Sequence, residues 1–182
     1  MYLERRTYVK RWSHQKPEQK YSVLVKKAGK KDPNINPEKI SYVIEEVAYW
    51  RKANQIHKWF VENCVESADW HGEAVYVSRD KIKELVELCE KVLKASKLVK
   101  GMIKNGETYK DGKWEPIMQP GKYIKDPTVA KELLPNEDGF FFGSQEYDQY
   151  YVDDLKETIK QLKPYTEDKE NVFADFEYSA SW

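Results

Sequence analysis

The stretch "EEVAYWRKANQIHKWFVEN", residues 45–63, determines how the centre of the chain folds. Its apolar residues recur at the three- and four-residue spacing of one helix face: Tyr49, Ala53, Ile56 and Phe60. Upstream, Asn36 and Pro37 are the residue types of a helix N-cap and of a first helical position. We therefore predict one long helix from residue 37 to about residue 64.

The same stretch carries four side chains that a purely structural helix rarely needs: Trp50, Arg51, Asn54 and His57. Arg51 could hold a carboxylate or phosphate with two hydrogen bonds. Trp50 could stack on a ring, while Asn54 could pair with an amide or base edge. The alternative is structural, with Arg51 in an ion pair between helices and His57 hydrogen-bonded at the edge of the core.

A second candidate lies in "GFFFGSQEYD", residues 139–148, where we predict that the last helix begins after Ser144. Backbone N–H groups at such a helix start, together with the helix dipole, can bind an anion. We therefore add Gly143, Ser144 and Tyr147 to the predicted ligand-binding residues. The alternative is that Ser144 is only a helix cap, because the spacing of a phosphate-binding Walker motif is absent.

Both ends of the chain alternate apolar and polar residues with a period of two, which is typical of half-buried antiparallel strands. The segments are "YSVLVKK" (21–27), "VFADFEYSASW" (172–182) and, less regularly, "YLERRTYVKRW" (2–12). Between them, apolar stripes predict further helices after Ser78, over residues 126–135 and from residue 144 to Pro164. The fold class is therefore α+β, a small antiparallel sheet joining N- and C-terminal strands, packed with about four helices.

Residues 101–125 follow neither period and interrupt this single domain, residues 1–182. The dipeptides Asn105-Gly106 and Asp111-Gly112 are strong turn signals. The segment "ETYKDGKWEP" predicts a small hairpin with Tyr109 and Trp114 beside its turn. We expect this insertion to be a binding loop or a contact between copies of the chain.

Composition narrows the classes of partner and compartment. Lys+Arg and Asp+Glu both number 31, so the net charge is zero and a wholly basic surface for nucleic acid is not expected, although zero net charge still permits a local basic patch. No apolar run approaches the roughly 18 residues of a membrane span, and the first residues lack the apolar region of a secretory signal. We expect a cytoplasmic protein without a membrane contact.

The residues indicate a binder rather than an enzyme. Neither cysteine has a second ligand at the spacing of a zinc site, and no nucleophile elbow is present. Four acids could form a magnesium cluster between two helices, although neither helix carries them at favourable spacing: Glu45, Glu46, Asp153 and Asp154. We therefore predict no catalytic residues, no metal and no cofactor, with a magnesium-dependent nucleotide hydrolase as an alternative.

The blocks "YWRKANQIHKWF" (49–60) and "GFFFGSQEYD" (139–148), with "EYSASW" near the C-terminus, resemble a group of small proteins encoded in bacteriophages and prophages. The likeness covers most of the chain except residues 98–125. It implies a product made in the host cytoplasm during infection and favours a host-interaction or counter-defence role. It provides no catalytic residues to assign here.

Together these features predict a non-enzymatic binder of a small anionic, nucleotide-like ligand, which would sequester a host immune signal. The leading alternative is a protein-interaction module, in which the aromatic surface and the insertion contact a host protein or a second copy of the chain in a homo-oligomer.

Overall fold

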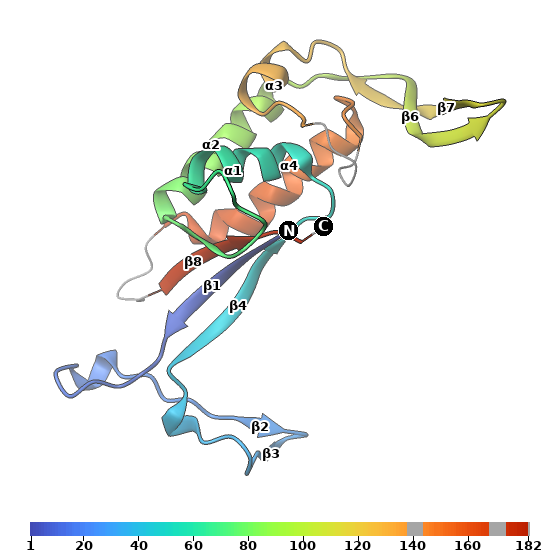
Figure 1. Cartoon of the computed structure of the whole chain (residues 1–182). Coiled ribbons are helices and arrows are strands. Elements are labelled where there is room, and N and C mark those ends of the chain that lie inside the picture. Colours follow the sequence, from blue (N-terminus) through green and yellow to red (C-terminus); the bar gives the residue numbers. More distant parts are fainter. Residues whose placement is uncertain (138–143, 168–173, 182) are drawn as a thin grey trace.

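A four-stranded antiparallel sheet joins the two ends of the chain in the computed structural model, which describes residues 1–137, 144–167 and 174–181 (Figure 1). The strands, in their order across the sheet, are β4 (Tyr42–Tyr49), β1 (Tyr2–Tyr8), β8 (Ala174–Ser179) and β5 (Val75–Val77). The two central strands pair with Tyr2 opposite Ser179. This arrangement confirms the predicted α+β fold with a sheet that unites both termini.

Three helices cover one face of this sheet: α1 (Asn54–Cys64), α2 (Arg79–Ala95) and α4 (Gln149–Leu162) (Figure 1). Leu3, Phe176 and Tyr178 point from the sheet into the core beneath them and are almost fully buried. Ser78 caps α2 as predicted, accepting a hydrogen bond from the backbone N–H of Lys81. The fourth helix of the described residues, α3 (Thr128–Leu133), packs against α2.

The prediction of one helix from residue 37 to 64 is wrong in its first half. Asn36 does act as a cap, but only for the single 3-10 turn η2 (Pro37–Lys39), and residues 42–49 form β4. This strand pairs with β1 along its whole length, and Tyr2 lies opposite Tyr49. Its three β-branched residues favour a strand, and the pairing satisfies backbone groups of β1 that would otherwise lack partners. The helix begins only at Asn54.

The predicted strand over residues 21–27 is also largely absent. Only its last two residues form a strand, β2 (Lys26–Lys27), which pairs with β3 (Lys30–Lys31) and not with β1. Both edges of β1 are already occupied by β4 and β8, so residues 21–25 cannot pair with β1 as a hairpin partner. Their alternating pattern therefore has no partner strand to pair with.

The last helix starts later than predicted. Asp148, not Ser144, is the cap of α4, and its Oδ1 accepts hydrogen bonds from the backbone N–H groups of Tyr150 and Tyr151. The residues before it are extended because the carbonyl of Tyr147 accepts a hydrogen bond from the N–H of Ile124. The predicted helix start after Ser144 is therefore wrong, so no helix dipole supports an anion there, and Gly143 itself lies outside the described residues.

The hairpin predicted in the insertion is confirmed and is longer than its turn signals indicated. It consists of β6 (Leu98–Lys110) and β7 (Lys113–Ile124), with Tyr109 opposite Trp114. Asp111 and Gly112 both have positive φ, as a tight two-residue hairpin turn requires. The hairpin projects away from the helices (Figure 1), and both faces at its tip are exposed.

Two glycines lie at the root of this hairpin, where it packs beside α4. A Cβ at Gly121 would lie 2.4 Å from Cδ1 of Ile103, which is buried, and a Cβ at Gly101 would lie 2.5 Å from the ring of Tyr123. Next to Gly121, the N–H of Lys122 donates to the side-chain oxygen of Gln149 on α4. The small residues therefore allow the hairpin to pack closely enough to bond to α4.

We expect Gly121→Val to lower the free energy of unfolding by about 1–3 kcal/mol, because the new side chain must displace Ile103 from its buried position. Lys122→Val, at the neighbouring exposed position, should change stability by less than about 0.5 kcal/mol. Urea denaturation of both variants measures the difference. Equal stability of the two variants would show that the hairpin root is not closely packed.

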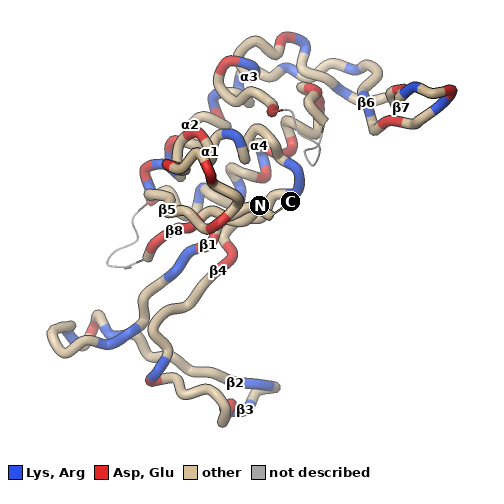
Figure 2. Tube along the Cα trace, in the orientation of Figure 1, with Lys and Arg blue, Asp and Glu red and all other residues tan. Residues whose placement is uncertain are grey.

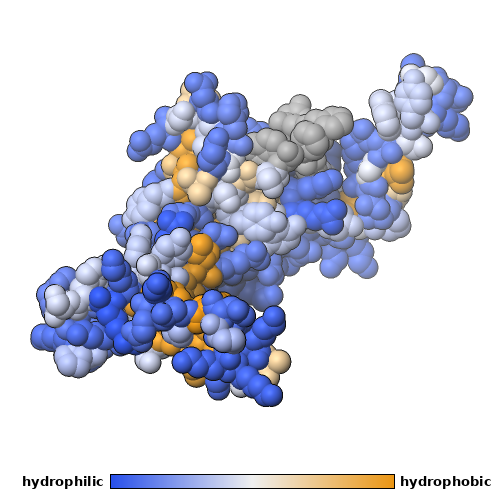
Figure 3. Space-filling view, turned by 60° about the horizontal axis from the view of Figure 1, so that its bottom comes forward, coloured by the Kyte–Doolittle hydropathy of each residue, from blue (hydrophilic) through white to orange (hydrophobic). Residues whose placement is uncertain are grey.

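Residues 9–41 form a second projection, here called the arm, between β1 and β4. It contains β2, β3, η2 and the 3-10 turn η1 (Pro17–Gln19). Lysine and arginine are prominent along it, whereas the helices carry both charges (Figure 2). Seen from the side of the arm, hydrophobic residues gather in a strip between hydrophilic ones (Figure 3). Val43 and Ile44, at the root of the arm, are among the exposed apolar residues.

Candidate ligand-binding site

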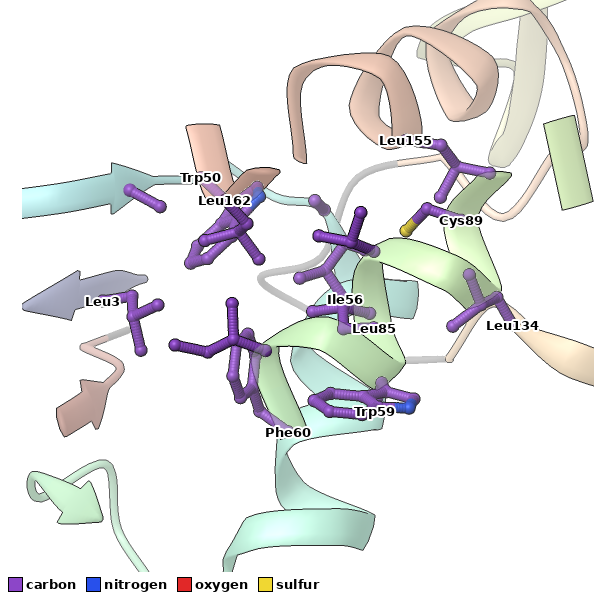
Figure 4. Packing of buried hydrophobic residues seen from close by; sticks show 14 of the residues in the cluster. Leu3, Trp50, Ile56, Trp59, Phe60, Leu85, Cys89, Leu134, Leu155 and Leu162 are labelled. Carbon is purple, nitrogen blue, oxygen red and sulfur yellow. The ribbon is translucent and has the colours of Figure 1, made fainter. Parts of the chain in front are cut away.

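Two of the predicted ligand-binding residues belong to the core. Trp50 is buried among apolar side chains (Figure 4), and its Nε1 donates a 2.9 Å hydrogen bond to Oγ1 of Thr158. His57 is also buried, with its Nδ1 2.8 Å from the hydroxyl of Tyr178. Burial lowers the pKa of His57 to about 4, so this imidazole is neutral at pH 7. These contacts match the structural alternative for both residues.

Asn54 has a bridging role. It is buried, its Oδ1 accepts from the N–H of Glu137, and its Nδ2 donates to the carbonyl of Ser144. The amide therefore holds residues 137 and 144 next to the start of α1, on either side of the segment that is not described. Ser144 uses its hydroxyl to accept a hydrogen bond from the N–H of Glu146.

Tyr147 lies on a neighbouring surface. Its hydroxyl accepts a hydrogen bond from the N–H of Asn136, and its ring packs against that of Tyr151 with centroids 5.0 Å apart. It lines a cavity of about 630 Å³ between the hairpin and α3. Tyr147 is therefore separate from Arg51, which lines a different cavity.

Arg51 and Ser144 are brought together, as predicted, in a cavity of about 390 Å³ between the β4–α1 connection, the hairpin and α4. Two further cations line it, Lys52 and Lys104. Arg51 and Lys52 make no hydrogen bond or ion pair with the residues that the structure describes. Lys52 also has a φ of +67°, a left-handed conformation that is costly for a residue with a side chain.

The same cavity is lined by three carboxylates, Glu146, Asp148 and Asp154, of which the sequence suggested only Asp154, as part of a magnesium cluster. Asp154 accepts a 3.2 Å hydrogen bond from Nε2 of Gln55, and burial raises the pKa of Asp154 to about 6. Asp148 is almost fully buried, and burial raises its pKa as well. Its Oδ2 has no hydrogen-bond partner among the described residues. The position of Asp148 directly before the apolar stripe of α4 could have identified it as an N-cap. No local sequence signal shows that a carboxylate is buried.

The four acids of the alternative magnesium cluster do not come together among the described residues. Glu45 forms an ion pair with Arg5 across the sheet, and Asp153 forms one with Lys156 on the outer face of α4. In the part of the chain that the structure describes, no three His, Cys, Asp or Glu side chains are placed to hold a metal ion. Nor does any helix in these residues have the length and apolar character needed to cross a membrane.

No protein-family model, no curated protein and no solved structure matches this chain.

Proposed function

We propose that the protein is a non-enzymatic binder of a small ligand that carries both an anionic group and hydrogen-bond donors, as a nucleotide does. The observation that carries this function is the meeting, in one cavity, of strained Lys52, half-buried Asp154 and Arg51, which has no partner among the described residues. At about 390 Å³ the cavity is within the range of small-molecule sites.

The cations account for the anionic part of the ligand. Arg51 can donate two parallel hydrogen bonds to a phosphate or carboxylate, and Lys52 adds positive charge beside it. Lys104 lines the same cavity but is paired with Glu107. A residue held in a strained conformation is more often found at functional sites than elsewhere. Lys52 keeps its side chain at a position where glycine would be favoured, which is consistent with selection for its charge.

The carboxylates of the cavity can accept hydrogen bonds from the donor groups of the ligand. Partial burial of Asp154 costs stability, and so does leaving Oδ2 of buried Asp148 without a partner among the described residues. A ligand amino or hydroxyl group would offset this cost by donating to them. Tyr150, which is exposed at the same cavity, offers a ring face for stacking. In an infected host cell, a protein with this site would sequester a nucleotide signal of the immune response.

Native mass spectrometry and calorimetry with mono-, di- and cyclic nucleotides test this function. We expect an intact nucleotide to be retained and Arg51→Ala to weaken its binding roughly 10- to 100-fold, the usual contribution of a charge-assisted hydrogen bond. Lys91→Ala, which removes an exposed charge from α2, is the control. Conversion of the nucleotide into product would point to an enzyme instead, and retention of no small molecule would exclude the proposed site.

We expect Lys52→Gly to change stability and binding in opposite directions. Glycine relieves the left-handed strain and should raise the free energy of unfolding by about 0.5–1 kcal/mol, while loss of the cation weakens ligand binding. Lys52→Ala is the matched control, since it removes the charge but keeps the strain. Thermal unfolding and calorimetry measure the two quantities, and a variant that gains stability without losing affinity would exclude Lys52 from the site.

A second candidate function is supported by the hairpin. The rings of Tyr109 and Trp114 pack edge to face at 5.3 Å and are 62% and 67% exposed. An isolated two-stranded ribbon is only marginally stable in water, and its two free edges can pair with a like strand. A second copy of the chain is the occupant that would bury both features. Light scattering should then give a dimer for the wild type and a monomer for Tyr109→Ser/Trp114→Ser.

A further inference from the structure

The arm concentrates positive charge in a chain whose total charge is zero. Residues 9–41 contain nine lysines and arginines and three carboxylates, a net charge of +6, so the remainder of the chain carries −6. The basic residues are Lys10, Arg11, Lys16, Lys20, Lys26, Lys27, Lys30, Lys31 and Lys39. A local charge of this size attracts polyanions even when the whole protein is neutral.

The tip of the arm places like charges opposite one another. Strands β2 and β3 pair Lys26 with Lys31 and Lys27 with Lys30, and all four residues are exposed. None of these lysines forms an ion pair with the residues that the structure describes. Directly opposed like charges destabilise a strand pair, and the turn between the strands holds Ala28 at a φ of +50°. The four lysines therefore repel one another in the free protein, and an anion bound across them would offset this repulsion.

The root of the arm closes an aromatic cavity of about 820 Å³. Trp12 from the arm, Tyr8 from β1, and Tyr76 and Phe176 from the sheet provide its rings. Trp12 and Tyr76 are exposed and can offer their faces to a planar ring. The cavity therefore has the aromatic lining on which an unpaired base stacks.

Polar groups at the same cavity suit the edge of a base. The side-chain oxygens of Gln15 and Gln19 accept from the N–H groups of Trp12 and Lys16, which leaves each amide nitrogen as a donor at the cavity wall. Asp175 is the carboxylate of the cavity, and its negative charge raises the pKa of the neighbouring Tyr8 hydroxyl. A carboxylate repels phosphate but accepts a hydrogen bond from a base amino group. We therefore expect phosphates at the lysines of the arm and a base in the aromatic cavity.

We propose that the arm binds single-stranded nucleic acid, with backbone phosphates on the four lysines of the β2–β3 tip and a base in the aromatic cavity. Basic and aromatic side chains combine in this way where proteins hold a strand without reading its sequence. A duplex keeps its bases stacked internally, so it would use the lysines but not the cavity. This partner differs from the expectation based on the net charge of the whole chain, because the opposing charges lie on different parts of the molecule.

The test is fluorescence anisotropy of the full chain with a labelled 20-nucleotide oligo-dT strand and with a duplex of the same length. Changing Lys26, Lys27, Lys30 and Lys31 to Gln should weaken single-strand binding at least tenfold. It should also reduce the slope of log affinity against log salt by about 3, at about 0.7 per phosphate contact. The control changes Lys91, Lys94, Lys156 and Lys160 to Gln, which removes the same charge from the exposed faces of α2 and α4.

Trp12→Ala and Tyr76→Ala test the cavity. Each should weaken binding of the single strand several-fold and leave duplex binding unchanged. Equal losses for the tip variant and the control variant would show non-specific charge attraction and overturn the proposal. The proposal would also be overturned if the protein bound no nucleic acid but formed salt-sensitive assemblies. The partner of the arm would then be the acidic remainder of a second copy of the chain.

Discussion

Replacing Phe60 by Ala should lower the free energy of unfolding by about 3–5 kcal/mol, the usual cost of emptying an aromatic site in a core. Phe60 is fully buried and belongs to the packed cluster shown in Figure 4. Its ring stacks on that of Tyr178 at 4.1 Å and lies 5.6 Å from that of Trp50. A single substitution therefore loosens α1, β8 and the end of β4 together.

Phe60→Leu is the control, because it retains most of the apolar volume. We expect it to cost less than half as much as Phe60→Ala in urea denaturation monitored by circular dichroism. Equal losses for the two variants would show that ring stacking, and not filled volume, stabilises this site. A loss below about 1 kcal/mol for Phe60→Ala would contradict the central position of Phe60 in the core.

Acidification should reveal two buried groups with opposite effects on stability. Burial lowers the pKa of His57 to about 4 from its ordinary 6.5. The unfolded chain therefore takes up a proton first, and the stability due to neutral His57 is lost as the pH falls from about 6.5 to 4. With 1.36 kcal/mol per pKa unit, this loss amounts to about 3 kcal/mol.

Asp154 acts in the other direction. Burial raises its pKa to about 6 from an ordinary 3.8, so the folded chain binds the proton first. Its contribution is fully present below pH 3.8 and is lost as the pH rises through 6, by about 3 kcal/mol. The two groups titrate over overlapping ranges and should largely offset each other in the wild type.

The variants separate the two contributions. Relative to wild type, His57→Asn should gain about 3 kcal/mol as the pH falls from 7 to 4, because Asn keeps a polar atom near Tyr178 but binds no proton. Asp154→Asn should change by a similar amount with the opposite sign, and should be most stabilising, relative to wild type, at pH 7. Denaturation midpoints at a series of pH values measure both, and parallel curves for all three proteins would contradict the assigned pKa shifts.

Local signals predicted the parts of the fold that form locally. The Asp111-Gly112 dipeptide identified the hairpin because its backbone conformation is determined by the turn residues themselves. Ser78 and the apolar stripe that follows identified α2 for the same reason. Alternation at the C-terminal end identified β8, whose Phe176 and Tyr178 face the core.

The candidate site could be predicted only in part. Arg51 and Ser144 do line one cavity, but Asp148 and Asp154 were not assigned to it, because a carboxylate gains its binding character from burial. Trp50 and His57 have residue types that suit a ligand, yet their partners Thr158 and Tyr178 lie more than a hundred residues along the chain. No local pattern contains such a partner.

By itself, then, the sequence determined the turn of the β6–β7 hairpin, the cap of α2, the apolar stripes of α1, α2 and α4, and the α+β class, since each depends on residues close in the chain. Only the tertiary structure decided that residues 42–49 are a strand, because β1 supplies the backbone partner that overrides helical periodicity. Tertiary structure also placed the basic arm and the acidic remainder apart in space, whereas the net charge of the sequence adds them to zero.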